Sequence, residues 1–141
     1  MQSSISSAPV SKAALWAGRV ISGIVTLFLL LAAVMDLAKP SSVVEGMVKY
    51  GYPESSLVGI GVALLISVIL YVVPRTSILG AILLTGYLGG AVATHVRAGD
   101  PVGRMLVPVF FGLLTWGGLY LRDERLRALA PLRSPRATLA T

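Results

Sequence analysis

The stretch PRTSILGAILLTGYLGGAVATHVRAGDP, residues 74–101, decides how the rest of the chain is interpreted. It holds an apolar run of helical length that follows a Pro-Arg-Thr-Ser turn and stops at a Gly-Asp-Pro break. The chain's only histidine, His95, lies near the far end of this run. Because two hydrophobic runs precede it and one follows it, we expect it to be the third of four membrane helices.

The composition favours lipid as the solvent of this chain. Of the 141 residues, 55% are hydrophobic and 13% are charged, and the mean hydropathy is +0.83, which is atypical of a water-soluble domain of this length. The net charge of +6 is spread between and beyond the apolar runs and forms no basic stripe with aromatic residues, so nucleic acid is not an expected partner. One histidine and no cysteine argue against a metal or haem site.

Four apolar runs are predicted to span the membrane, at residues 13–38, 54–73, 77–96 and 105–121. Their order and short connections predict an all-α fold, a transmembrane four-helix up-down bundle over residues 13–130. Residues 1–12 are predicted to form a disordered N-terminal tail, and residues 131–141 a flexible C-terminal tail. Residues 41–50 have the spacing of a short amphipathic surface helix, with a partly ordered loop as the alternative.

The basic residues are divided unequally between the two ends of such a bundle. With four spans both termini share one face, which then holds eight of the 12 Lys and Arg residues. The positive-inside rule places this face, and both termini, in the cytoplasm of a bacterial inner (plasma) membrane. The eight residues are Lys12, Arg19, Arg75, Arg122, Arg125, Arg127, Arg133 and Arg136.

Small residues spaced four apart predict where helices approach closely in lipid. Two such stripes predict a tight contact between the second and third spans. They are Gly59, Ala63 and Ser67 in the second run, and Gly86, Gly90 and Thr94 in the third. Weaker versions of the pattern are Gly18 with Ser22 in the first run, and Gly112, Gly117 and Gly118 in the fourth.

Two ionisable residues lie inside the predicted spans and are therefore candidates for function. Asp36 and His95 both come within about a turn of the non-cytoplasmic end of their span, so one polar pocket is predicted there, with Lys39, Arg97 and Asp100 nearby. A carboxylate beside an imidazole orients the ring and raises its basicity, as acid/base catalysis requires. The alternative is that Asp36 pairs with a neighbouring cation and His95 only caps a helix.

Aromatic residues in the last two spans have two interpretations. Tyr87 and Trp116 either anchor the helices at the membrane interface or line a site for a quinone or another flat lipid.

The runs YGYPESSLVGIGVALL, VVPRTSILGAILLTGYLGGAVATHVRAGDP and LLTWGGLYLRDERLRALAP resemble the DoxX-like bacterial membrane proteins, over about residues 20–131. The most specific parts are the Pro-Arg-Thr-Ser turn before Leu-Gly-Ala and the Gly-Ala-x-Ala-Thr-His ending. The resemblance implies a four-span inner-membrane protein. It also implies a role beside quinone-linked oxidoreductases, since better understood relatives include thiosulfate:quinone oxidoreductase components and a membrane complex tied to oxidative stress resistance.

The sequence therefore leads to two hypotheses of function. The first is an accessory protein that has no cofactor of its own, binds quinone or another lipid-soluble ligand, and assists a membrane oxidoreductase partner. The alternative is a small membrane-embedded enzyme that uses Asp36 and His95 as acid and base on a hydrophobic substrate. Transport is a third option that would require a homo-oligomer, because the four short spans show no inverted repeat.

Overall fold

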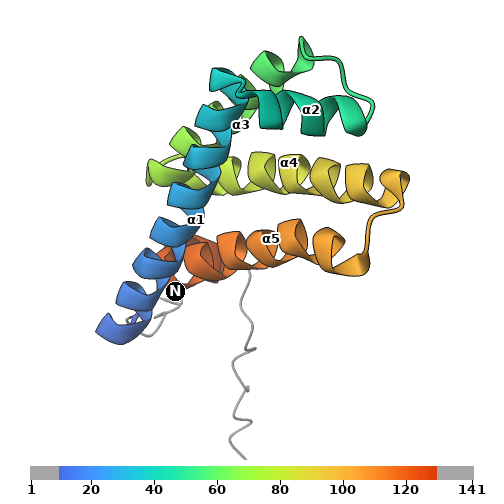
Figure 1. The fold of residues 1–141 in the computed structure, drawn as a ribbon. Coiled ribbons are helices and arrows are strands. Elements are labelled where there is room, and N and C mark those ends of the chain that lie inside the picture. The colour runs from blue at the N-terminus through green and yellow to red at the C-terminus, as the bar shows by residue number, and fades with distance from the viewer. Residues whose placement is uncertain (1–9, 130–141) are drawn as a thin grey trace, which may run out of the picture.

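The computed structural model describes residues 10–129, which are helical almost throughout and contain no strand. The predicted tails lie outside the described residues, apart from residues 10–12. Figure 1 shows the arrangement of the helices along the chain. They are α1 (Lys12–Ala38), α2 (Ser41–Lys49), α3 (Ser56–Val72), α4 (Ser77–Ala98), α5 (Val102–Arg122) and α6 (Glu124–Leu129).

Each of the four predicted apolar runs overlaps one of the long helices α1, α3, α4 and α5 along most of its length. Among the described residues, α1, α4 and α5 are long and apolar enough to cross a membrane. The apolar helix α3 has 17 residues, a length of about 26 Å at 1.5 Å per residue. The largest difference from the predicted bounds is at the start of α5, which begins at Val102 rather than at residue 105. Pro101 has extended backbone directly before this helix, and the fixed φ of proline suits that position.

The four long helices pack in a closed order. Helix α1 contacts α3 and α5, and α4 also contacts α3 and α5. In Figure 1, α4 and α5 run side by side and α1 crosses them obliquely. The beginnings of α1 and α4 therefore meet the ends of α3 and α5 at one extremity, which we call the Tyr71 end. The opposite extremity, where α4 ends and α2 lies, is called the His95 end.

Tyr71 joins three helices at the end named after it. Its side chain is fully buried, and its hydroxyl donates a hydrogen bond to the Thr115 carbonyl oxygen of α5 at 2.9 Å. Because that bond uses the phenolic proton, Ser22 Oγ of α1 is the donor in the 3.0 Å contact with Tyr71 Oη. The Tyr71 carbonyl oxygen accepts a hydrogen bond from Arg122 Nη2 at 2.9 Å. Both polar ends of this residue are thus satisfied in an apolar interior.

Glycines permit close backbone contact at the same end. A Cβ on Gly18 of α1 would lie 2.8 Å from Leu121 Cβ of α5, and one on Gly118 of α5 would lie 2.7 Å from Ser22 Oγ. A Cβ on Gly80 of α4 would lie 2.5 Å from Tyr71 Cα. The α1–α5 and α3–α4 pairs therefore approach closely here. The α1–α5 contact uses the weaker predicted pattern, whereas Gly80 belonged to no predicted stripe.

The contact predicted between the second and third spans is present, because α3 packs against α4, but the role predicted for the glycines of the two main stripes is wrong. A Cβ added at Gly59 of α3, or at Gly86 or Gly90 of α4, would meet no heavy atom within 4 Å. The helices converge at the Tyr71 end, so small residues further along α4 leave space rather than make contact. Spacing alone does not distinguish these two uses of glycine.

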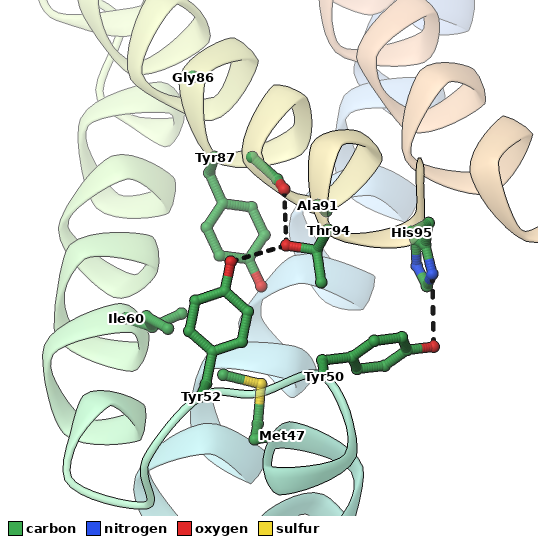
Figure 2. Close-up of a pocket in the computed structure, with 10 residues that line it drawn as sticks. Met47, Tyr50, Tyr52, Ile60, Gly86, Tyr87, Ala91, Thr94 and His95 are labelled. Atoms are coloured by element: carbon green, nitrogen blue, oxygen red, sulfur yellow. Dashed lines mark hydrogen bonds between the residues drawn. The ribbon is translucent and has the colours of Figure 1, made fainter. Parts of the chain in front are cut away.

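Helix α2 confirms the short helix that was predicted for residues 41–50, rather than a partly ordered loop. It has no buried residue, and its last turn leads through Tyr50 into Gly51, which has a φ of 81°. A residue without Cβ adopts that left-handed conformation at little cost. The resulting turn directs Tyr50 and Tyr52 toward α4 (Figure 2).

We predict that Gly80→Ala destabilises the protein by about 1–3 kcal/mol, the usual cost of overpacking a fixed contact. The new Cβ would collide with backbone atoms of Tyr71, which cannot rotate away. Thermal unfolding in detergent, followed by circular dichroism, measures the loss.

The matched control is Gly89→Ala in the same helix, where a Cβ meets nothing within 4 Å. Since alanine has the higher helix propensity, this variant should keep or slightly raise the melting temperature. Equal melting temperatures for the two variants would contradict the close approach of α3 and α4.

Candidate functional site

A pocket of about 420 Å³ lies at the His95 end between α2, α3 and α4 (Figure 2). Its walls combine apolar side chains, three tyrosines and the single histidine. The residues that line it are Met47, Tyr50, Tyr52, Ile60, Gly86, Tyr87, Gly90, Ala91, Thr94 and His95. Two glycines of the stripe that was predicted to pack against α3 thus form part of a cavity wall.

The C-terminus of α4 brings His95 and Asp100 together. The helix ends at Gly99, whose φ of 69° reverses the chain, and the Asp100 amide donates a hydrogen bond back to the His95 carbonyl oxygen at 3.1 Å. This is the left-handed termination that glycine favours at helix ends. The turn places Asp100 Oδ2 2.7 Å from His95 Nδ1.

Asp100 is the acceptor at the centre of a small polar cluster. Tyr50 Oη donates to Asp100 Oδ2 at 2.7 Å, and Arg104 Nη1 donates to Asp100 Oδ1 at 3.3 Å. Because an ionised carboxylate only accepts, His95 Nδ1 carries the ring proton in its contact with Oδ2. The hydrogen bonds from His95 and Tyr50 hold the pKa of the Asp100 carboxyl below its ordinary value of 3.8. Donating to Asp100 raises the pKa of the Tyr50 phenol.

A second set of contacts fastens the turn after α2 to α4. Thr94 Oγ1 donates to the Gly90 carbonyl oxygen at 2.9 Å, so Tyr52 Oη is the donor in its 2.8 Å contact with Thr94 Oγ1. Arg97 Nη2 donates to the Tyr50 carbonyl oxygen at 2.6 Å, and its guanidinium carbon lies 5.3 Å from the Tyr52 ring centroid. Together with the Asp100 cluster, these bonds hold α2 and its turn over the pocket.

The structure gives His95 a different carboxylate partner from the predicted one. Asp36 makes no hydrogen bond or ion pair within residues 10–129, and its Cβ lies 3.0 Å from the Cβ position of Gly61 on α3. It is half-buried between α1 and α3 and does not line the pocket. The Gly99 turn explains the difference, because it returns Asp100 to His95. Catalytic roles for Asp36 and His95 stay a prediction.

The predicted ligand-binding residues do not all lie at the pocket. Tyr87 lines the pocket, and Arg97 and Asp100 fasten its cover. Lys39 is on the surface, where its Nζ lies 3.6 Å from Glu54 Oε1. Trp116 Nε1 donates a hydrogen bond to a threonine of α4 at 2.8 Å, outside the pocket lining.

Sequence reasoning missed Tyr50 and Tyr52 as part of the site. The signal was present in the Tyr-Gly-Tyr-Pro segment, where two tyrosines flank a glycine directly after an amphipathic helix. No group of three or more His, Cys, Asp or Glu residues within the described part of the chain is placed to hold a metal ion.

Comparison with known proteins identifies the family of this chain. Apolar helices long enough to cross a bilayer define an integral membrane protein. The sequence profile of the DoxX-like family matches residues 20–118, well over half of the chain. The chain belongs to the DoxX-like family. No curated protein and no solved structure matches it.

We predict that the stabilising effect of Asp100 disappears in acid. A carboxyl whose pKa is lowered on folding contributes stability that is complete above its unfolded pKa. That contribution is lost as the pH falls through the folded pKa, below about 4. The difference in melting temperature between the parent protein and Asp100→Asn should therefore be constant from about pH 7 to 5 and shrink below about pH 4.

The control is Glu45→Gln, which removes an exposed carboxylate of α2 that forms no ion pair within the described residues. Its melting temperature should follow that of the parent protein at every pH. If the Asp100→Asn difference persists undiminished at the lowest pH, the ionised carboxylate does not hold the cluster together.

Proposed function

We propose that this DoxX-like protein crosses a bacterial inner membrane four times, through α1, α3, α4 and α5, with both termini in the cytoplasm. The unequal division of lysine and arginine supports this orientation. The length of about 26 Å for α3 is close to the 30 Å of a hydrocarbon core, and flanking residues or local thinning of the bilayer make up the difference.

Cysteine labelling checks this topology directly, because the chain is naturally free of cysteine. In intact cells, a membrane-impermeant maleimide should label Ser42→Cys on α2. It should label Arg75→Cys, in the turn between α3 and α4, only after the membrane is permeabilised. Both side chains are exposed. The cysteine-free parent protein gives the background of non-specific labelling. The reverse labelling pattern would contradict the proposed orientation and place both termini outside the cytoplasm.

We further propose that the pocket binds a quinone or another flat lipid-soluble molecule, and that the protein assists a membrane oxidoreductase by holding this ligand. The observation that carries the proposal is the pocket itself. Its volume of about 420 Å³ is within the usual range for small-molecule sites, and its walls are aromatic and apolar with few polar groups. A flat ring stacks well against tyrosine side chains.

The polar groups of the pocket suit a carbonyl and its reduced form. With its Nδ1 proton donated to Asp100, His95 keeps Nε2 as an acceptor for a hydroxyl group. The Tyr87 hydroxyl forms no hydrogen bond within residues 10–129 and is available as a donor to a carbonyl oxygen. In this proposal the protein has no cofactor of its own, and the partner oxidoreductase supplies the electrons.

A leucine placed inside the pocket tests ligand binding without removing any contact. Gly90 lines the pocket and a Cβ there meets nothing within 4 Å, so Gly90→Leu should fold normally and fill the space. We expect it to weaken decylubiquinone binding at least about tenfold, a loss of about 1.4 kcal/mol. Binding is measured at equilibrium in detergent, and quinone co-purified from membranes is counted by mass spectrometry.

The neighbouring Gly89→Leu is the matched control, since it adds the same side chain outside the pocket lining. It should bind decylubiquinone like the parent protein. Equal affinities for both leucine variants, or a parent protein that carries no stoichiometric quinone and captures no oxidoreductase, would refute the proposed function.

A further inference from the structure

A second pocket, of about 450 Å³, lies at the Tyr71 end, far along the helices from the first. Its lining includes Arg19 of α1, Arg122 at the end of α5, and Arg125 of α6, together with the carboxylates Asp123 and Glu124. Figure 1 shows the beginning of α1 beside the end of α5. Charges of both signs therefore surround this pocket.

Two of these arginines form hydrogen bonds within the protein. Arg122 Nη2 donates to the Tyr71 carbonyl oxygen at 2.9 Å, and Arg125 Nη2 donates to the Pro74 carbonyl oxygen. The first bond satisfies a carbonyl group in the last turn of α3, which has no partner inside the helix, and the second fastens the turn that follows α3. Arg125 Nε also lies 3.6 Å from Asp123 Oδ1, so this carboxylate is partly neutralised.

Asp123 has a further partner on α4. Its Oδ2 accepts a hydrogen bond from Ser77 Oγ at 3.1 Å, and its Oδ1 accepts one from the Arg125 amide at 2.9 Å. Its charge is therefore engaged on two sides in fastening α4 and α6 to this end of the molecule. Asp123 consequently opposes an incoming anion less than its formal charge suggests.

Arg19 is different, because it forms no hydrogen bond or ion pair within the described residues. It lies inside the apolar helix α1, directly after Gly18, whose Cβ position is 2.9 Å from the Arg122 backbone nitrogen. An unpaired guanidinium in a membrane helix is costly unless it reaches water or an anion. Beside it, Arg122 has a buried Nε without a hydrogen-bond partner in the described part of the chain.

We propose that this pocket binds a phosphate group through Arg19, with Arg122 as a fixed second positive charge. The planar guanidinium matches two phosphate oxygens and forms strong charge-assisted hydrogen bonds with them. The phosphate belongs to an anionic phospholipid at the membrane surface or to a soluble phosphate compound. Glu124, which is exposed and unpaired within residues 10–129, weakens the site by repulsion.

Three single substitutions test the site in the full-length protein. Native mass spectrometry counts the phosphatidylglycerol retained from nanodiscs of equal phosphatidylglycerol and phosphatidylcholine. Calorimetry in neutral detergent measures binding of inorganic phosphate and of glycerol 3-phosphate. Arg19→Gln should lower binding at least threefold, and Glu124→Gln should raise it. Arg75→Gln removes an exposed arginine at the same end, which has no ion-pair partner among residues 10–129 and lies outside the pocket, so it should leave binding unchanged.

The two measurements identify the source of the phosphate. An effect of Arg19→Gln on lipid retention alone assigns the site to a phospholipid head group, and an effect in calorimetry assigns it to a soluble compound. Arg19→Gln leaves the Tyr71 contacts intact, and an unchanged melting temperature excludes loss of fold as the cause. Equal losses for Arg19→Gln and Arg75→Gln, or no loss in either measurement, would overturn the proposal. This test does not depend on quinone binding at the other end.

Discussion

The hydroxyl of Tyr71 is the polar group on which the packing of this protein depends. An apolar interior provides no water, so a buried phenol must find its partners on neighbouring helices. Tyr71 finds them on α1 through Ser22 and on α5 through Thr115. Its backbone also fills the space that Gly80 of α4 leaves open. One residue of α3 thus fixes the positions of the other three long helices.

This meeting point determines where space remains. Gly18, Gly80 and Gly118 bring the helices together at the Tyr71 end. Because helices that cross at an angle diverge away from their closest approach, the opposite end is left open between α3 and α4. Gly86 and Gly90 face that opening and line the first pocket. Helix α2 then covers it, held by hydrogen bonds from Tyr50 and Tyr52 rather than by buried apolar area.

The four long helices were predictable from the sequence because lipid selects long apolar runs, and α2 was predictable from its periodicity. Whether a glycine packs against a helix or lines a cavity was not predictable, because the four-residue spacing is the same in both cases. The partner of His95 was hidden for a related reason. Asp36 and Asp100 are both near the predicted end of a span, and only the left-handed backbone of Gly99 decides that Asp100 returns to the ring.

Charged side chains fasten both ends of the molecule. At the Tyr71 end, Arg122 and Arg125 donate to the carbonyl oxygens of Tyr71 and Pro74, and Asp123 accepts from a serine of α4. At the His95 end, one carboxylate accepts from both His95 and Tyr50. Nδ1 of His95 is thereby engaged in the hydrogen bonds that connect α4 to the turn after α2. Because the Asp100 carboxylate accepts the Nδ1 proton, the turn after α4 sets the tautomer of the ring and leaves Nε2 as an acceptor at the pocket wall.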